Sequence, residues 1–325
     1  MRRLSVREVR FPLKKPFAIS YSTVSEVELV EVEIEEDGVR GRGECRPYPR
    51  YGESVASVTG QIEAMRARIE AGTDRKGLLA AMPAGAARNA IDNALHDLAA
   101  KQAGRPLHEL LGLAAPEPVP VTYTIGLDTP EAMAREALEC ERPLLKLKLG
   151  GAGDLERVEA VRKAVPETRL IVDANEAWTA DNVREWLAPM AAMRIELIEQ
   201  PLPAGKDEAL RGIERKVPLC ADESFHEADD LPAIDGLYDF VNIKLDKTGG
   251  LTAALEAADA AETHGYGIML GCMMASSLSM AQAFPLAARA RFVDLDAPLL
   301  LAADRDPPVR YHGAIMQPPP TTLWG

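Results

Sequence analysis

Short apolar runs that end in a polar or charged residue recur along most of the chain, at intervals of roughly 25 residues. The residues that end five of these runs are Lys148, Asp173, Glu199, Asp222 and Lys244. One strand, one helix and two connecting loops take about that length of chain. The repeat therefore predicts successive parallel strands with these five side chains at the same ends. A (β/α)₈ barrel keeps its chemistry at that end of its strands.

The same pattern predicts the elements of the barrel. The expected strands are 121–127, 144–148, 170–173, 197–199, 219–222, 241–244, 268–272 and 292–296. Helical spacing predicts helices at 129–140, 154–164, 180–190, 207–214, 251–264 and 276–288. The link at 228–234 is too short for a full helix. We therefore predict an α/β fold, a TIM-like (β/α)7-8 barrel.

The residues before the barrel follow a different pattern. Polarity alternates as in half-exposed antiparallel strands at 4–9, 26–36 and 39–44. Asp37-Gly38 is a hairpin signal between the last two. Apolar residues at helical spacing follow at 55–70 and 84–100. This part of the chain is therefore expected to be α+β.

Prolines mark the boundary between the two patterns, at Pro116, Pro118 and Pro120. We predict an α+β capping domain at 1–115, the barrel at 116–297 and a C-terminal segment at 298–325. The last segment contains a further hairpin pattern near 309–316 and is expected to return to the capping domain.

Composition and charge exclude several classes of protein. The chain has 325 residues, of which 47% are hydrophobic and 27% charged, enough for a large core. It has no apolar run of about 18 residues and no basic stripe, and its net charge is −13, so neither membrane nor nucleic acid is an expected partner. The four cysteines are scattered without metal-ligand spacing, which favours reduced thiols in a cytoplasmic protein. A homo-oligomer is left open.

Three carboxylates stand at the ends of neighbouring strands. Asp173, Glu199 and Asp222 each follow apolar residues on a strand expected to be buried on both faces, where a lone carboxylate is costly. Converging carboxylates repel one another, so a cation is expected among them. Ligation by oxygen alone suits Mg²⁺ or Mn²⁺ rather than zinc. Any one of these acids could instead be a helix N-cap, but three at matched spacing favour a metal site.

Two lysines lie on the first of these strands. Lys146 and Lys148 point to the same face, whereas Leu145, Leu147 and Leu149 face the helices. Mutual repulsion and a nearby divalent cation both favour the neutral amine, so a lowered lysine pKa and a base near neutral pH are expected. The alternative is a pair of lysines that extend from the strand end into water. The leucine alternation favours the first interpretation.

Lys244 ends the sixth strand, across the barrel from the second. A substrate between them would have one lysine on each face, which is what a 1,1-proton transfer requires. A metal that binds the carboxylate next to that carbon would stabilise the enediolate. Two alternatives stay open, a structural pair with Asp246 and a Schiff-base lysine. The Schiff base would leave the three carboxylates without a function.

Asp294 and Asp296 share one face at the end of the last strand. An uncompensated pair of carboxylates would be costly there, so a bound cation is expected. It could be a second metal or an organic cation. A substrate ammonium group fits best if the metal is held by the other three carboxylates.

The motifs at the strand ends resemble those of the enolase superfamily, in its muconate-lactonising subgroup. They are Lys146-x-Lys148, Asp173-Ala-Asn175, Glu199-Gln-Pro201, Asp222-Glu-Ser224 and Asn242-Ile-Lys244-Leu-Asp246-Lys-Thr-Gly-Gly250. No His ends the sixth or seventh strand, unlike in the mandelate-racemase subgroup. Four further motifs are similar to those of the L-Ala-D/L-Glu dipeptide epimerases, namely Pro47-Tyr-Pro-Arg-Tyr-Gly-Glu53, Pro83-Ala-Gly-Ala-Ala-Arg-Asn-Ala-Ile-Asp92, Leu270-Gly-Cys-Met273 and Asp294-x-Asp296.

The resemblance implies an enolase-like fold and a role for each motif. Mg²⁺, one per subunit and replaceable by Mn²⁺, would be bound by Asp173, Glu199 and Asp222. Lys148 and Lys244 would be the two bases, and Lys146 would support the substrate carboxylate. Asp294 and Asp296 would hold the ammonium group of a dipeptide. Further substrate contacts are implied for Tyr21, Thr23, Arg50, Tyr51, Thr124, Cys272 and Met273.

One departure from the resemblance concerns the loops that would cover the substrate side chain, at 18–25 and 47–53. Relatives that act on Ala-Glu carry an arginine in the first loop, whereas here it reads Ala18-Ile-Ser-Tyr-Ser-Thr-Val-Ser25. Arg46 or Arg50 could substitute for it. Otherwise the second residue of the substrate would be neutral or apolar.

The expected function is that of an isomerase, a Mg²⁺-dependent dipeptide epimerase that inverts the α-carbon of the C-terminal residue. The alternatives are an epimerase of neutral or apolar dipeptides, an o-succinylbenzoate synthase and a muconate cycloisomerase. The Asp294 and Asp296 pair argues against the last two, because anionic substrates are repelled by two more anions. A non-catalytic barrel is disfavoured, because so many buried charges reduce stability.

Overall fold

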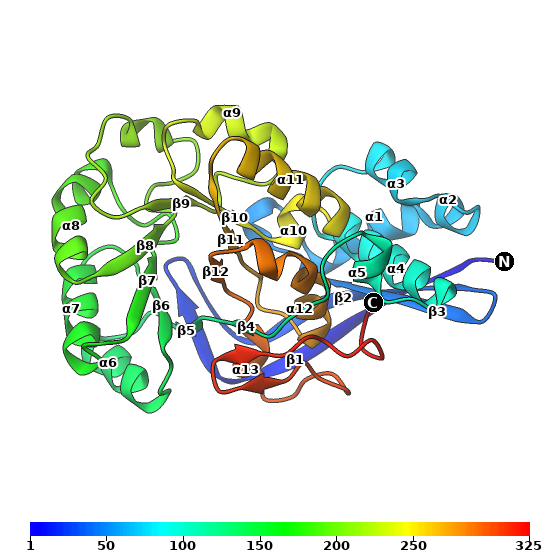
Figure 1. Ribbon diagram of the computed structural model, residues 1–325, viewed down its shortest axis with the longest axis horizontal. Coiled ribbons are helices and arrows are strands. Elements are labelled where there is room, and N and C mark those ends of the chain that lie inside the picture. Colours follow the sequence, from blue (N-terminus) through cyan, green and yellow to red (C-terminus); the bar gives the residue numbers. More distant parts are fainter.

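The periodic apolar runs form the strands of one eight-stranded parallel sheet, in a computed structural model that describes residues 1–325 (Figure 1). In chain order, and also in order across the sheet, they are β5 (Tyr123–Ile125), β6 (Leu144–Lys148), β7 (Arg169–Asp173), β8 (Ile195–Glu199), β9 (Leu219–Ala221), β10 (Phe240–Ile243), β11 (Gly267–Leu270) and β12 (Phe292–Val293). The backbone N–H of Thr122 donates to the carbonyl of Val293 at 2.9 Å, which joins the two edges. The expected α/β fold with a TIM-like barrel is confirmed.

Strand alternation explains why polar side chains gather at one end of the barrel. Seven inward side chains from β6 to β12 are apolar and form one buried cluster, namely Leu144, Ile171, Leu197, Cys220, Phe240, Met269 and Phe292. The residue two positions later on a strand faces the same way. On the first three of these strands that residue is Lys146, Asp173 or Glu199. The polar side chains therefore lie over an apolar layer that fills the amino-terminal end of the barrel.

Helices cover the outside of the sheet. The longer ones are α6 (Pro130–Glu139), α7 (Asp154–Ala164), α8 (Ala180–Ala192), α11 (Leu251–Thr263) and α12 (Ser277–Ala283). The link after β9 is short, as expected, with the 3₁₀ turn η3 (Ala228–Asp230) and α9 (Leu231–Ile234). The helix expected at 276–288 is wrong in its second half. It continues after α12 as the 3₁₀ segment η4 (Phe284–Arg289), where Pro285 has no N–H to continue an α-helix.

The helix expected at 207–214 is also wrong. Only the 3₁₀ turn η2 (Asp207–Leu210) forms. The Asp207 carboxylate accepts hydrogen bonds from Ser224 Oγ at 2.7 Å and from the Tyr238 hydroxyl at 2.5 Å. Gly212 then turns the chain with a φ of 73°. Tertiary hydrogen bonds and a left-handed glycine therefore override the local helical pattern.

The N-terminal part forms an antiparallel sheet with helices on one face. Its strands β1 (Arg3–Ile19), β2 (Ser22–Glu36) and β3 (Val39–Cys45) are adjacent in that order. Against them pack α1 (Val55–Ala64), α2 (Arg66–Glu70), α3 (Arg75–Ala81) and α4 (Ala86–Ala103), which share a core distinct from that of the barrel. The expected helix at 55–70 is interrupted at Met65, where α1 ends and α2 begins.

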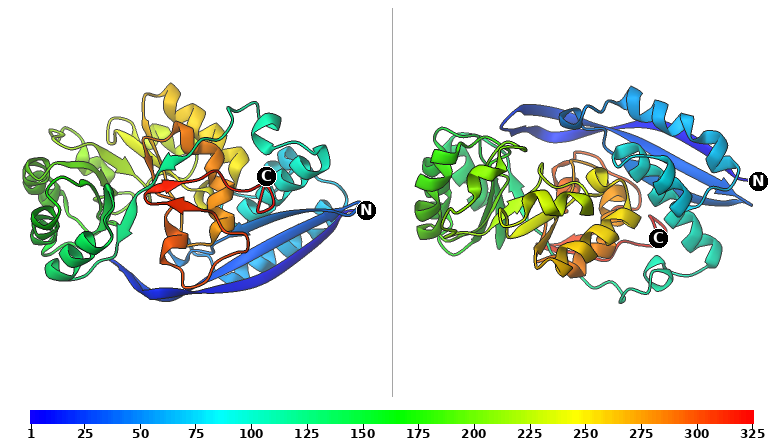
Figure 2. Two further views of the ribbon diagram at one scale, coloured as in Figure 1. Left: turned by 60° about the horizontal axis from the view of Figure 1, so that its bottom comes forward. Right: turned by 90° about the horizontal axis from the view of Figure 1, so that it is seen from above.

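The segment expected to be a loop at 18–25 is part of a long β-hairpin. β1 runs to Ile19 and β2 starts at Ser22, so only two residues form the turn. Figure 2 shows this ribbon extending from the capping domain to the barrel. Near its tip, the Leu127 N–H donates to the Ala18 carbonyl at 2.9 Å and Ser20 Oγ donates to the Asn175 carbonyl at 2.8 Å. The hairpin thereby carries residues of the capping domain to the strand ends.

The C-terminal residues lie against both parts of the chain. β13 (Tyr311–His312) and β14 (Ile315–Met316) form a hairpin that pairs with β4 (Val119–Pro120). The Trp324 indole N–H donates to the Asn93 carbonyl of α4 at 3.2 Å. Three short helices complete the fold, namely α5 (Leu107–Leu110), α10 (Leu245–Thr248) and α13 (Ala297–Leu300). No helix combines the length and the apolar character needed to cross a bilayer. The division of the chain into domains stays a prediction.

Candidate active site

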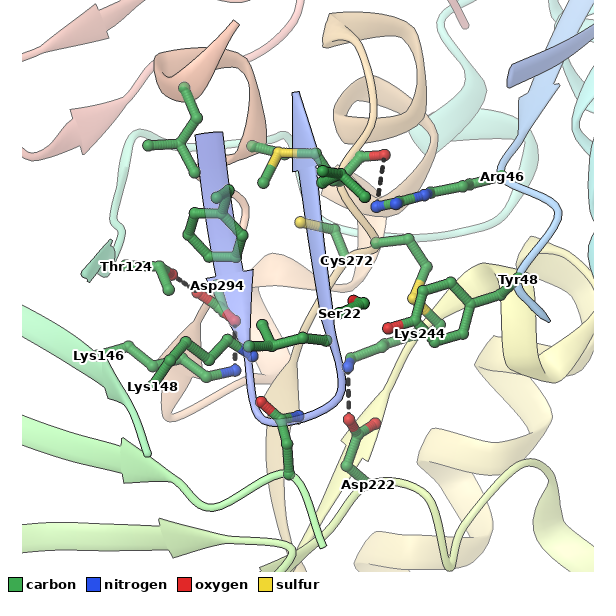
Figure 3. A pocket seen from close by; sticks show the side chains of 18 of the residues that line it. Ser22, Arg46, Tyr48, Thr124, Lys146, Lys148, Asp222, Lys244, Cys272 and Asp294 are labelled. Atoms are coloured by element: carbon green, nitrogen blue, oxygen red, sulfur yellow. Dashed lines mark hydrogen bonds and ion pairs between the residues drawn. The ribbon is translucent and has the colours of Figure 1, made fainter. Parts of the chain in front are cut away.

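A pocket opens at the carboxyl ends of the barrel strands, where the β1–β2 hairpin crosses them (Figure 3). The empty space in it, open mouth included, is about 750 Å³. The N-terminal part contributes Phe17, Ile19, Tyr21, Ser22, Val24, Arg46, Tyr48 and Tyr51. The barrel and the residues after it contribute Thr124, Lys146, Lys148, Asn175, Asp222, Glu223, Lys244, Cys272, Met273, Met274, Asp294, Asp296, Ala297 and Leu300. The pocket is thus built jointly by both parts of the chain.

Lys146 connects three carboxylates at the bottom of this pocket. Its side chain is 1% exposed, and Nζ lies 2.6 Å from Glu199, 2.8 Å from Asp294 and 3.2 Å from Asp173. Lys148, one inward position further along β6, lies nearer the pocket and pairs with Asp173 at 2.6 Å. The two lysines that the sequence places on one strand face therefore do share the barrel interior.

Lys244 approaches the pocket from the other side. It follows β10 directly, and its Nζ lies 2.5 Å from Asp222 and 3.9 Å from Glu199. In Figure 3, Lys148 and Lys244 extend from opposite walls of the pocket. A ligand that lies between them would have an amine on each face.

The expected lowering of the lysine pKa is wrong for Lys146. Burial opposes the charged form of Lys146, but the surrounding carboxylates raise its pKa well above the ordinary value. Burial also opposes charge on Lys244, whose pKa is raised by Asp222 and Glu199. Carboxylates within 3 Å of each of these amines outweigh the repulsion between the lysines.

The structural alternative for Lys244, a pair with Asp246, is also wrong. The Asp246 carboxylate faces the N-terminal part of the chain, where it accepts hydrogen bonds from Asn89 Nδ2 at 2.7 Å and from the Arg46 N–H at 3.1 Å. Lys244 and Asp246 therefore point in different directions, because the short helix α10 begins between them at Leu245. Lys244 faces the pocket, and Asp246 anchors the loop that carries Arg46.

Lysines, rather than a metal alone, neutralise the three carboxylates that the sequence singled out. The cation expected among Asp173, Glu199 and Asp222 is therefore supplied in part by the chain itself. As the side chains lie, no group of three His, Cys, Asp or Glu residues is arranged to hold a metal ion. Each carboxylate pairs with a lysine at 2.6 Å or less.

Buried oxygen atoms around these residues nevertheless fit a hard cation. Three of them have no hydrogen-bond partner, namely Asn175 Oδ1, Glu223 Oε2 and Asn242 Oδ1, and Glu199 Oε2 has only its ion pair with Lys146 at 2.6 Å. All four belong to residues at or just after neighbouring strand ends. Burial, reinforced by nearby carboxylates, raises the pKa of Glu199 to about 7 and that of Glu223 to about 8. Unsatisfied oxygens and excess negative charge are what Mg²⁺ ligation would relieve. The donor set at this site therefore suits the ion.

Asp294 and Asp296 lie in the pocket but have different partners. Asp294 pairs with Lys146 and accepts hydrogen bonds from the hydroxyls of Thr122 and Thr124. Asp296 accepts a hydrogen bond from the Thr124 N–H at 2.6 Å and has no cationic partner. Burial, with the Asp294 charge next, raises the pKa of Asp296 to about 7. Asp296 is thus the carboxyl group of this pair that lacks a cation.

The Gly249-Gly250 turn serves to join the two parts of the chain. The Arg88 guanidinium donates to the carbonyls of Thr248 at 2.6 Å and Gly249 at 3.1 Å. A Cβ at Gly249 would lie 2.4 Å from Arg88 Nε, and one at Gly250 would lie 2.5 Å from an Asp92 oxygen. Both glycines also have positive φ angles, 74° and 115°. Only glycine therefore fits this close approach of α4 to the segment that carries Lys244.

Most residues that the sequence assigned to substrate binding line the pocket, but two do not. Thr23 is absent from its lining. Arg50 also lies outside it and makes a bidentate ion pair with Glu176, at 2.6 and 2.7 Å. Glu176 belongs to the loop after β7, so Arg50 holds the 47–53 loop against the barrel.

Several residues of the site have no role predicted from the sequence. Tyr48, Asn175 and Glu223 line the pocket, and Lys247 is buried against Asp222 just beneath it. Asn175, Glu223 and Lys247 follow Asp173, Asp222 and Lys244 by one to three positions. The residues just after each predicted strand-end charge could therefore have been included as candidates for the site. Tyr48 lies in a motif that was noted as a covering loop only.

The chain is similar to several known proteins over nearly its whole length. An L-Ala-D/L-Glu epimerase of Escherichia coli (strain K12) is 45% identical over 314 residues, which cover 96% of this chain and 98% of that protein. An N-acetyl-D-glutamate racemase of a Pseudoalteromonas species is 44% identical over 300 residues, which cover 91% and 95%. A crystal structure of an Agrobacterium tumefaciens enolase family member with homology to dipeptide epimerases, with sodium and L-Ala-L-Glu bound, matches with a TM-score of 0.98 and 48% identity and covers 100% of both chains.

Family models match both parts of the chain. Residues 1–112 match the N-terminal domain of mandelate racemase and muconate lactonizing enzyme, and residues 131–322 match the enolase C-terminal domain-like family. The resemblance recognised from the strand-end motifs is thereby confirmed. The chain belongs to the enolase superfamily.

Proposed function

We propose that the protein is a Mg²⁺-dependent dipeptide epimerase, an isomerase that inverts the α-carbon of the C-terminal residue of a dipeptide. One observation carries the proposal, the approach of Lys148 and Lys244 to the same pocket from opposite walls. The relatives named above, an L-Ala-D/L-Glu epimerase among them, support the same chemistry. The four cysteines are all free thiols, which supports a cytoplasmic location.

The two lysines would act in turn on one carbon. The neutral amine of one lysine removes the α-proton, so that a new N–H bond forms while the electron pair of the C–H bond stays on the substrate. The ammonium of the other lysine then gives a proton to the opposite face and becomes neutral. The direction reverses for the other enantiomer, so both amines are needed for inversion.

Three carboxylates would hold the metal ion. Asp173, Glu199 and Asp222 are the proposed ligands, because they end adjacent strands and lie among the unpartnered oxygens. Mg²⁺ bound there would supply positive charge where negative charge develops on the substrate carboxylate. Lys146, at 2.6 Å from Glu199 and 3.2 Å from Asp173, would add a fixed positive charge beside two of these ligands.

Asp296 and Asp294 would bind the free ammonium group of the dipeptide. Asp296 has the capacity, because no cation of the chain pairs with it. This feature favours a dipeptide over the dicarboxylate substrates of an o-succinylbenzoate synthase or a muconate cycloisomerase, which two further carboxylates would repel.

The test is deuterium incorporation at the α-carbon. Incubation of the protein with Mg²⁺ and a dipeptide library in D₂O should add one mass unit to the dipeptides that it epimerises, and chiral chromatography should show the inverted product. EDTA should abolish both signals and added Mg²⁺ should restore them. Full activity in chelator, or deuterium in no dipeptide, contradicts the proposal.

A further inference from the structure

Arg46 is the one cationic side chain of the pocket lining without an acidic partner. The lining lysines Lys146, Lys148 and Lys244 each contact a carboxylate within 3 Å. Arg46 makes no ion pair, although its side chain is half-buried at the pocket wall. A buried positive charge without a counter-ion is costly unless a ligand supplies one.

The Arg46 guanidinium is held in position but retains free donors. One amino group donates to the Met274 carbonyl at 3.3 Å, and the group lies over the Tyr48 ring at 5.5 Å. A guanidinium carries five N–H donors, so most remain available for a ligand. Figure 3 shows Arg46 entering from the capping domain, across the pocket from Asp294. A carboxylate is the group that such a planar donor fork binds best.

The backbone of Arg46 is fixed independently of its side chain. Its N–H donates to the Asp246 carboxylate at 3.1 Å, and Asp246 is held in turn by Asn89. The loop is thereby tied to the segment that carries Lys244. Replacing the Arg46 side chain should leave this anchor intact, which makes the residue suitable for substitution.

Arg50 is not an equivalent candidate. Its charge is already paired, because Nε and Nη2 donate to the Glu176 carboxylate at 2.7 and 2.6 Å, and its side chain lies outside the pocket. The hairpin tip offers no cation either, because Tyr21, Ser22 and Val24 are the residues that it contributes to the lining. Arg46 and Arg50 were equally good candidates from the sequence, but only Arg46 lines the pocket without an acidic partner.

We infer that Arg46 binds the side-chain carboxylate of the substrate, so that the enzyme selects dipeptides whose C-terminal residue is acidic. The inference rests on the proposed function and specifies its substrate class. The substrate would then lie between two charged ends of the pocket, with its ammonium at Asp296 and its acidic side chain at Arg46. The α-carbon lies between these ends, where Lys148 and Lys244 approach. An arginine in the covering hairpin is therefore not required for recognition of an acidic residue.

The test compares L-Ala-L-Glu with L-Ala-L-Gln, which has nearly the same shape and no side-chain charge. The wild-type enzyme should favour the glutamyl substrate in kcat/KM by about 30-fold or more, the effect expected when one partner of a buried charge pair is removed. Arg46→Met should abolish this preference while kcat/KM for L-Ala-L-Gln changes by less than about threefold. Arg46→Lys should retain part of it.

Arg50→Met is the matched control, because it removes an arginine of the same capping-domain loop region from outside the pocket. It should change kcat/KM for both substrates by the same factor and so leave their ratio intact. Equal losses for both substrates in Arg46→Met would overturn the inference, since the side chain would then be structural or bind a group that both substrates share. So would a wild-type enzyme that does not distinguish them.

Calorimetric binding in the presence of Mg²⁺ separates this inference from the proposed function. Arg46→Met should raise the Kd for L-Ala-L-Glu by about 30-fold or more and leave that for L-Ala-L-Gln within about threefold. This binding pattern without deuterium exchange would contradict the epimerase and retain the carboxylate site. Exchange on both dipeptides with no Arg46-dependent difference in Kd would retain the epimerase and overturn the role of Arg46.

Discussion

Lys247 holds Asp222 by two contacts, from its Nζ to a carboxylate oxygen at 2.6 Å and to the backbone carbonyl of the same residue at 2.6 Å. The Lys247 side chain is 0% exposed, and Nζ also donates to the Asn242 carbonyl at 2.9 Å. Lys244 takes the other carboxylate oxygen of Asp222. One acidic side chain is therefore oriented by two lysines, one at the pocket and one beneath it.

The first prediction follows from this pair. Lys247→Met removes the contact that orients Asp222, a proposed metal ligand, without touching the substrate pocket. The affinity for Mg²⁺ should fall by about 10- to 100-fold, as when the hydrogen-bond partner of a metal ligand is lost. The measurement is the Mg²⁺ concentration needed for half-maximal activity, with the exposed Lys163→Met as control. An unchanged Mg²⁺ requirement with reduced kcat would assign Lys247 a different role.

The second prediction concerns the two bases. Lys148→Ala and Lys244→Ala should each reduce epimerisation by about 10²- to 10⁴-fold, the usual contribution of a positioned acid or base. Each variant should still exchange the α-proton of one enantiomer, because the amine on that face remains. Proton NMR in D₂O, started separately from each diastereomer, distinguishes the two faces. Wild-type epimerisation by either variant is incompatible with a two-base mechanism.

Strand ends were the part of the site that the sequence could predict. Side chains alternate within strands such as Leu144–Lys148, and successive apolar runs end in a charged residue. These two features place Asp173 and Glu199 on the inward face of the barrel, however the loops fold. The partners of each charge were not predictable in this way. Lys247 meets Asp222 because a single helical turn follows β10, and no periodicity indicates which way that turn points.

The capping domain illustrates a second limit. The segment 18–25 lacks strong strand periodicity, and its extended form depends on pairing between β1 and β2 and on contacts with the barrel at Ala18 and Ser20. Likewise, Arg46 and Arg50 carry the same charge and lie close together in the sequence. Only the position of Glu176, on a loop more than 100 residues away, separates their roles. Long-range contacts of this kind leave no mark in local sequence.

The third prediction concerns stability at low pH and the interface between the two parts of the chain. His96 of α4 is 1% exposed, and Nε2 lies 2.9 Å from Thr252 Oγ1 of α11 and 3.6 Å from the Asp92 carboxylate. Burial, with a smaller contribution from Arg75, lowers the pKa of His96 from 6.5 to about 3. Since the folded pKa is depressed, the unfolded chain binds the extra proton between these values. Stability from the neutral imidazole is therefore present above pH 6.5 and lost as the pH falls toward 3.

His96→Gln should remove that dependence. The difference in unfolding free energy between wild type and variant should shrink by about 2 kcal/mol from pH 7 to pH 5, or roughly 1.5 pKa units at 1.4 kcal/mol each. Comparing the two proteins cancels the opposite trend of Asp92, whose pKa burial raises to about 6. Urea unfolding at the two pH values provides the measurement. A constant difference would mean that His96 is protonated in the folded protein.

The last prediction concerns the ammonium site. Asp296 receives only the Thr124 N–H and no cation, so the dipeptide ammonium is expected to be its partner. N-acetylation of L-Ala-L-Glu removes that charge and leaves the buried carboxyl group unpaired, at a cost of about 2–5 kcal/mol. The value of kcat/KM should fall by about 30- to several-thousand-fold. In Asp296→Asn the free and acetylated dipeptides should differ much less, because the amide cannot pair with an ammonium. N-acetyl-glutamate belongs in the same assay, because one similar protein is an N-acetyl-D-glutamate racemase. If wild type uses N-acetyl-L-Ala-L-Glu as well as the free dipeptide, Asp296 does not bind an ammonium group, and if it also inverts N-acetyl-glutamate equally well, the enzyme is a racemase of N-acylated amino acids.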